Sequence, residues 1–257
     1  MAAVSLMARR LGAGAKGQWL AAFFVLTLPI IVLQASGRKN DIVLGFFFAA
    51  LVYFVVESSS KKLSWLERTA CGLSVGLGVL TKGSFPVFVL PFLAWMLVNV
   101  LRRSGWKSVL AFVALGLACM LALNGGHWIR NTLTFGNTIF SGEEGPVINA
   151  RFGLRVTVSN LVRSSAVQLN GRYGLVNEAV QKTVVKVHDG LDIPVFDPEI
   201  TQGPGEFYYV PNREEVAGNP LHFVLTGLSL IILIPSLFQK QKRKTSRMTL
   251  WLGLGGL

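Results

Sequence analysis

The chain has 257 residues, of which 51% are hydrophobic and only 15% are charged. A soluble domain carries roughly 25% charged residues, so this composition excludes a cytosolic globule, a disordered regulator and a small disulfide-stapled secreted domain. A polytopic membrane protein remains. The formal net charge of +12 first indicates membrane topology, because Lys and Arg accumulate in cytoplasmic loops, and we predict no nucleic-acid partner.

Six apolar runs follow one another along the chain. A hydrocarbon core of ~30 Å needs about 20 residues of helix, and the runs cover residues 18–34, 42–56, 63–80, 85–101, 109–124 and 221–238, while residues 248–257 begin another. We therefore expect an all-α membrane protein with about six complete transmembrane helices plus the start of a further one. The expected parts are a helical region over 1–124, a long extracytoplasmic loop or small domain over 125–218, and a helix with a basic cytoplasmic loop over 219–257.

The basic residues predict the orientation of the chain. With a cytoplasmic amino end, the four inner segments hold 14 Lys and Arg residues, whereas the short outer turns hold three, Arg38, Lys39 and Lys82. Short loops decide the positive-inside rule, so the loop 125–218 is expected outside. The alternative of a cleaved signal peptide over residues 1–36 is disfavoured, because its apolar run is long for such a segment.

Small residues and cysteines within the apolar runs indicate packing rather than chemistry. Gly72 and Gly76 form a GxxxG pattern, which is typical of close helix contact in membranes. Cys71 and Cys119 lie in different apolar runs and form neither a zinc-ligand spacing nor a disulfide framework. We expect both cysteines to be unreactive packing residues.

Asp41 is the first polar residue that interrupts the apolar pattern. It begins a span directly after Arg38 and Lys39. One interpretation is a helix N-cap, in which the carboxylate accepts backbone N–H groups. The other is an acidic group held at the mouth of an intramembrane cavity.

Lys82 is the second such residue, in a Thr-Lys-Gly break between two short apolar runs. Non-helical backbone at membrane depth is tolerated only where it lines protein or water, and an ionisable residue there is a functional hypothesis by default. We expect Lys82 to bind a phosphate or a carboxylate. The alternative is that its ammonium group reaches the membrane interface without a ligand.

The third candidate site follows the run that ends at residue 124. His127 and Arg130 are three residues apart, so one helical turn would place them on the same face, with Asn131 beside them. Arg provides a planar fork for phosphate, and His can bind a metal or donate to phosphate. With Glu143 and Glu144 nearby, His127 also provides a weak candidate for a divalent metal site.

Three segments together resemble the bacterial GT-C glycosyltransferases, the membrane relatives of protein O-mannosyltransferases and lipid A aminoarabinose transferases. They are residues 33–55 (LQASGRKNDIVLGFFFAALVYFV), 71–91 (CGLSVGLGVLTKGSFPVFVLP) and 127–140 (HWIRNTLTFGNTIF). The resemblance implies an enzyme that moves a sugar from a polyprenyl-phosphate donor to a lipid, glycan or protein acceptor on the outer face of the membrane. It also implies an integral membrane protein, expected in the bacterial inner membrane.

The resemblance also implies roles for individual residues. Lys82 matches the family's TKG lysine and Arg130 the basic residue after the family's seventh span, so both are implied phosphate ligands. We also expect Arg38, Lys39 and Asn131 to be substrate-binding residues. Asp41 matches the acidic residue of the second outer loop and is at most an accessory acid. The match at His222 and at the two glutamates is uncertain.

One departure from the family concerns its catalytic aspartate, which lies in the first outer loop. Counted by orientation, residues 18–34 correspond to the family's third span, so the chain is expected to be a fragment that lacks the first two spans and the catalytic loop. No catalytic residue is therefore assigned. Two alternatives stay open, a polytopic transporter and a non-catalytic lipid-phosphate-binding partner of a glycosylation complex.

Overall fold

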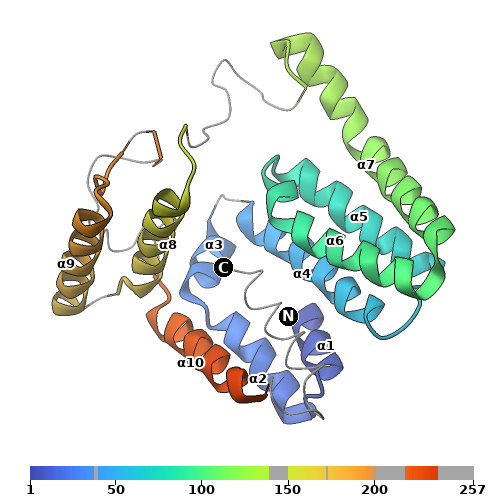
Figure 1. Cartoon of the computed structure of the whole chain (residues 1–257). Coiled ribbons are helices and arrows are strands. Elements are labelled where there is room, and N and C mark those ends of the chain that lie inside the picture. Colours follow the sequence, from blue (N-terminus) through green and yellow to red (C-terminus); the bar gives the residue numbers. More distant parts are fainter. Residues whose placement is uncertain (38–39, 139–149, 172, 198, 201–217, 237–257) are drawn as a thin grey trace. The chain divides into compact units, whose positions relative to one another are not determined.

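Helices form the secondary structure of the described residues in the computed structural model (Figure 1). The structure describes residues 1–37, 40–138, 150–171, 173–197, 199–200 and 218–236. Their helices are α1 (Ala2–Arg10), α2 (Ala15–Leu26), α3 (Pro29–Ser36), α4 (Asp41–Ser58), α5 (Trp65–Thr81), α6 (Phe85–Ser104), α7 (Trp106–Phe135), α8 (Leu154–Leu169), α9 (Gly174–Leu191) and α10 (Pro220–Ser236). The predicted all-α class is confirmed for this part of the chain.

Three helices in the described part are long and apolar enough to cross a membrane, namely α4, α6 and α7. A fourth candidate exists if α2 and α3, which are separated by a break at residues 27–28, form one broken span. Pro29 stands at the start of α3, and proline lacks the N–H that would continue the hydrogen-bond ladder of α2. Helices α5 and α10 have 17 residues each, so the count of six spans remains a prediction.

Helix α7 continues past residue 124, where we expected the span to end. Asn124 stays helical because its side-chain amide donates to the carbonyls of Met120 (3.0 Å) and Gly76 (2.9 Å) instead of competing with the backbone. The helix ends only at Gly136, whose φ of +67° is the left-handed conformation of a C-terminal glycine cap. His127, Arg130 and Asn131 therefore lie on a helix and not in a loop.

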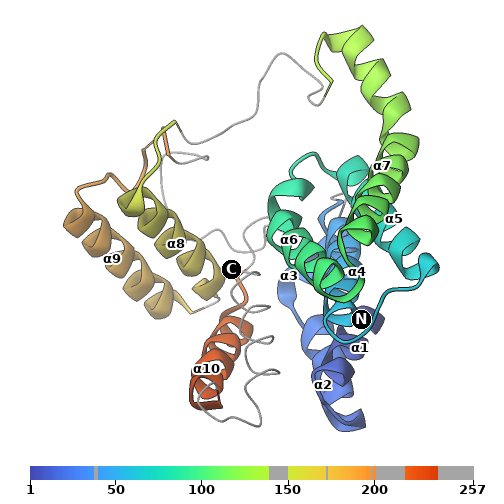
Figure 2. The same ribbon diagram turned by 45° about the vertical axis from the view of Figure 1, so that its right-hand side comes forward.

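The chain divides into two compact units, and each is described separately. Unit 1 comprises residues 1–26, 38–145 and 236–257, and unit 2 comprises residues 27–37 and 146–235. Within unit 1, α4, α5 and α6 enclose an apolar core that includes Leu51, Val55, Phe85 and Met96 (Figure 2). Cys71 lies fully buried in this core with its Sγ 3.6 Å from the Sδ of Met96, as expected for a packing residue.

Helices α5 and α7 pack closely through the predicted glycine pair, which confirms that prediction. A Cβ atom added at Gly72 would lie 3.1 Å from the Sγ of Cys119, and one added at Gly76 would lie 2.8 Å from Cδ1 of Leu123. The contact partner moves from Cys119 to Leu123 as the glycine moves from position 72 to position 76. The residue numbers rise in the same direction along both helices, so α5 and α7 run parallel. Their carboxyl-terminal ends therefore lie at the same end of unit 1.

Unit 2 contains a hairpin of α8 and α9, which lie side by side in both views. Inside it, the Oγ of Ser159 lies 2.8 Å from Nε2 of His188, whose Nδ1 lies 2.7 Å from the carbonyl oxygen of Val184. That carbonyl only accepts, so Nδ1 carries the proton and Nε2 accepts from the serine. Because both side chains are buried, this pair joins the two helices and is out of reach of a substrate.

Candidate functional site

The break between α5 and α6 presents Lys82 outside both helices. Residue Lys82 has φ −156° and ψ 125°, an extended conformation that ends α5, and Pro86 stands in the first turn of α6. The ring of Phe85 folds back over Gly78, where a Cβ atom would overlap it. Glycine at 78 thus permits the tight return of the chain, and the return fixes where the lysine emerges.

Asp41, at the start of α4, pairs with Lys82, a contact that the sequence analysis did not predict. The lysine Nζ donates to Oδ1 of Asp41 at 2.7 Å, and the side chains are 28% (Asp41) and 47% (Lys82) exposed. Beside this pair, Nδ2 of Asn40 donates to the carbonyl of Thr81 at 2.6 Å. Two polar contacts therefore hold the start of α4 against the end of α5 and leave the ammonium group partly accessible.

The interpretation of Asp41 as a helix N-cap is wrong. Asn40 occupies the N-cap position of α4, and Asp41 is the first residue of the helix. Its carboxylate contacts a cation instead of the backbone, because the α5–α6 break brings Lys82 within hydrogen-bond distance. An acid in the first turn is still favourable for the helix dipole.

A second polar cluster lies on α7, and it contains three of the predicted residues. Nη2 of Arg130 lies 3.0 Å from Nδ1 of His127, and Nδ2 of Asn131 lies 3.2 Å from Nε2 of the same ring. Arginine only donates, so Nδ1 accepts and Nε2 carries the ring proton. The protonated Nε2 needs an acceptor, and Oδ1 of Asn131 provides one when the side-chain amide is turned so that its oxygen faces the ring.

The two clusters lie toward the same end of unit 1, although no contact between them is seen among the described residues. Gly76 accepts a hydrogen bond from Asn124. Lys82 follows Gly76 by six positions, one residue beyond the end of α5, and Arg130 follows Asn124 by six positions on the parallel helix α7. At 1.5 Å per residue both lie roughly 9 Å further along. The exposed guanidinium of Arg130 and the ammonium of Lys82 are thus displayed at one end of the unit.

The predicted metal site gains no support from the described residues. Both ring nitrogens of His127 are engaged with neighbouring side chains, and no group of three His, Cys, Asp or Glu side chains suited to a metal occurs in the described part. Glu143, Glu144, Arg38 and Lys39 lie outside the described residues.

An ionic cluster at the opposite end of α4 was missed by the sequence analysis. Glu57 is fully buried, and its Oε1 accepts from Nε of Arg10 at 2.5 Å and from the hydroxyl of Tyr53 at 2.8 Å. Lys61 lies 3.7 Å from Oε2 of Glu57 and 2.6 Å from Glu67. The available sequence signal was Glu57 four residues before Lys61, at the polar end of an apolar run. That signal does not reveal the main partner of Glu57, because Arg10 is 47 residues away in the sequence.

The charges of this cluster support one another. The hydrogen bond and the charge of Glu57 raise the pKa of Arg10, and the hydrogen bond to Glu67 raises the pKa of Lys61. Glu67 also accepts from the backbone N–H of Ser64 while the hydroxyl of Ser64 accepts from the backbone N–H of Glu67, which forms a capping box at the start of α5. These contacts are structural, because they close the α4–α5 turn.

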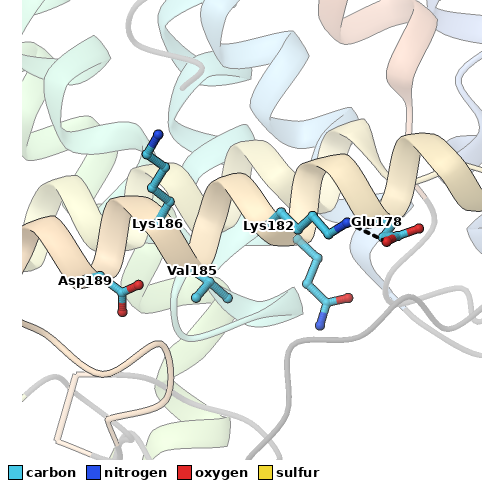
Figure 3. Close-up of a pocket in the computed structure, with 6 residues that line it drawn as sticks. Glu178, Lys182, Val185, Lys186 and Asp189 are labelled. Carbon is cyan, nitrogen blue, oxygen red and sulfur yellow. Dashed lines mark ion pairs between the residues drawn. The ribbon is translucent and has the colours of Figure 1, made fainter.

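In unit 2, α9 carries a charged face that surrounds a shallow hollow of about 430 Å³ (Figure 3). Lys182 pairs with Glu178 at 2.6 Å, one turn apart. Lys186 and Asp189 point to different sides of the helix. The charged side chains do not converge on one point, so this hollow does not provide a catalytic constellation.

The long apolar helices α4, α6 and α7 of unit 1 define an integral membrane protein. Residues 1–128 match the family model described as dolichyl-phosphate-mannose-protein mannosyltransferase, and this match supports a GT-C glycosyltransferase-like protein. The matched segment contains Asp41, Lys82 and His127 and ends before Arg130. No curated protein and no solved structure shows a significant match to the chain.

Proposed function

We propose that the chain acts in a membrane glycosyltransferase that moves a sugar from a polyprenyl-phosphate donor to an acceptor on the outer face of the membrane. The family match over residues 1–128 supports the reaction class. The single structural observation that carries the proposal is the presentation of Lys82 on a non-helical break, partly exposed and beside Asp41.

The proposed topology has six spans with a cytoplasmic amino end, in the bacterial inner membrane. The two short helices α5 and α10 complete the count, and α2 with α3 forms one broken span. The charge bias of the short loops supports this orientation, because the Glu57 end of α4 adjoins the basic inner segments and the Asp41 end adjoins Lys82. The end of unit 1 that displays Lys82 and Arg130 is then the outer end.

In the donor-free state, Asp41 neutralises Lys82. A phosphate group offers more oxygen acceptors than the carboxylate, so the donor phosphate replaces Asp41 on the lysine. Hydrogen bonds to charged groups are worth about 1.5–3 kcal/mol, and Arg130 adds a second cation with fork geometry. Cations placed on the polyprenyl-phosphate stabilise it as a leaving group when the sugar is transferred. The acceptor's general base is not assigned.

The proposal is tested by measuring binding of a fluorescent polyprenyl phosphate to the chain in nanodiscs, with the matching polyprenyl alcohol as the reference. We expect Lys82→Ala to weaken phosphate binding about tenfold, from the lower end of the range for charged hydrogen bonds, with no effect on the alcohol. Lys62→Ala, at an exposed lysine near the Glu57 end, is the matched control. Equal phosphate affinity in the Lys82→Ala and control proteins contradicts the proposal.

The variant Asp41→Asn tests whether Asp41 competes with the donor phosphate for Lys82 or instead holds Lys82 in position for the phosphate. If Asp41 competes with the phosphate for Lys82, its neutralisation tightens phosphate binding a few-fold. This tightening is largest at low salt, because the carboxylate that held the lysine and repelled the phosphate is gone and its charge effects are least screened there. Weaker binding in this variant shows instead that Asp41 positions the lysine. Phosphate binding without sugar transfer favours the non-catalytic partner, and solute flux favours a carrier.

A further inference from the structure

An apolar groove of about 640 Å³ runs along the α8–α9 hairpin of unit 2. Its lining includes Leu161, Ala166 and Leu169 of α8 and Leu175, Val176 and Val180 of α9. The residues from α9 recur at intervals of three and four, so they form one continuous stripe on that helix. Leu175 is 85% exposed and Leu161 is 52% exposed. Large exposed apolar patches of this kind mark interaction sites.

Cationic side chains border this stripe. Lys182 and Lys186 each lie three residues after a groove residue of α9, Ala179 and Thr183, so each is a neighbour of the stripe on the helix surface. Figure 3 shows Lys186 pointing to the side of α9 opposite Val185 and Asp189. An apolar stripe with lysines at its border is the pattern of a helix that lies in a membrane interface, with its lysines at the phosphate level.

The carboxyl end of α8 is tied to the start of the apolar helix α10. The backbone N–H of Asn219 donates to the carbonyl of Gln168 (2.8 Å), and its side-chain amide donates to Oε1 of Gln168 (2.8 Å). Pro220 then begins α10, whose side chains include exposed Leu221, Ile231 and Ile232. The groove is therefore held close to the amino-terminal end of the apolar helix α10. If α10 spans the membrane, the bilayer surface lies at this end and can cover the groove.

We propose that the α8–α9 hairpin lies on the bilayer, with its groove in the acyl-chain boundary and Lys182 and Lys186 on the phosphates of anionic lipids. This proposal rests on the membrane character of the chain and not on sugar transfer. A lipid surface fits better than a protein partner, because it meets both the continuous apolar stripe and the cations at its border with one ligand chemistry. Lys182 contributes less, because Glu178 already pairs with it.

The test uses spin labels on the full chain in nanodiscs that contain phosphatidylglycerol. Ala179→Cys places the label in the groove, and Gln181→Cys, two residues away on the opposite side of α9, is the matched control; both native side chains are exposed. Power saturation compares molecular oxygen, which concentrates in hydrocarbon, with a water-soluble nickel chelate. The label signal of the unsubstituted chain, which contains Cys71 and Cys119, is subtracted.

We expect the label at position 179 to relax severalfold more with oxygen than with the nickel chelate, and the label at 181 to show the reverse. Equal water-like accessibility at both positions overturns the proposal. A label at 179 that neither reagent reaches also overturns it, because a protein surface from this chain, a second copy or a partner then fills the groove. Lys186→Glu adds a charge test, and it should reduce the oxygen preference at 179 in phosphatidylglycerol more than in phosphatidylcholine.

Discussion

Gly76→Ala tests how closely α5 and α7 pack. The new methyl carbon would lie 2.8 Å from Cδ1 of Leu123 and 3.3 Å from the carbonyl oxygen of Cys119. Favourable carbon–carbon contacts lie near 3.5–4.0 Å, so the first distance is short by roughly 0.7–1.2 Å on that scale. The leucine methyl can rotate away, but the carbonyl belongs to the backbone of α7, so the helix itself has to move.

Overpacking of this kind costs about 1–3 kcal/mol, which corresponds to about 5- to 150-fold in the unfolding equilibrium. Gly116→Ala is the matched control, because its new methyl meets nothing within 4 Å although Gly116 lies on the same helix pair. The gain in helix propensity from glycine to alanine is common to both variants. The difference between them therefore isolates the contact between the helices.

The measurement is unfolding of the full chain in mixed micelles with increasing SDS, followed by tryptophan fluorescence and far-UV circular dichroism. We expect Gly76→Ala to unfold at a lower SDS fraction than wild type and Gly116→Ala to unfold at the same or a higher fraction. If both variants are equally stable, α5 and α7 do not approach as the structure shows, and the reasoning is refuted.

Two further predictions concern the Glu57 end of unit 1. Arg10→Ala removes the main partner of the buried Glu57 carboxylate and should lower the unfolding free energy by about 1–2 kcal/mol. This is less than the loss expected for a fully buried ion pair, because Arg10 is half exposed. The control Arg9→Ala, at the exposed neighbouring residue, should have little effect in the same SDS titration. Ser64→Ala breaks the capping box of α5 and should cost about 0.5–2 kcal/mol, whereas Ser60→Ala should not change the thermal midpoint measured by circular dichroism. Equal effects within either pair of variants would show that the contact is not formed.

The sequence predicted the protein class because span length and loop charge are local properties of the chain. Apolar runs of sufficient length predicted α4, α6 and α7, which the structure confirms. The sequence also singled out Asp41 and Lys82, because a charge within or beside an apolar run is costly and therefore conspicuous.

The end of the last of these spans was predicted at residue 124, because the apolar run stops there. The structure shows that the helix continues, since a hydrogen bond from Asn124 to Gly76 of another helix keeps Asn124 helical.

Only the tertiary structure decided which charges meet. Lys82 reaches Asp41 across 41 residues, and Arg10 reaches Glu57 across 47. Such pairs depend on which helices become neighbours. The shapes of the helix surfaces decide this, for example at Gly76, where the missing side chain lets α7 approach α5 closely. Composition and spacing do not contain that shape. The sequence by itself therefore determined a helical membrane protein with GT-C resemblance and a few conspicuous charged residues. Helix packing decided how those charges are paired, because it brings residues that are more than 40 positions apart within hydrogen-bond distance.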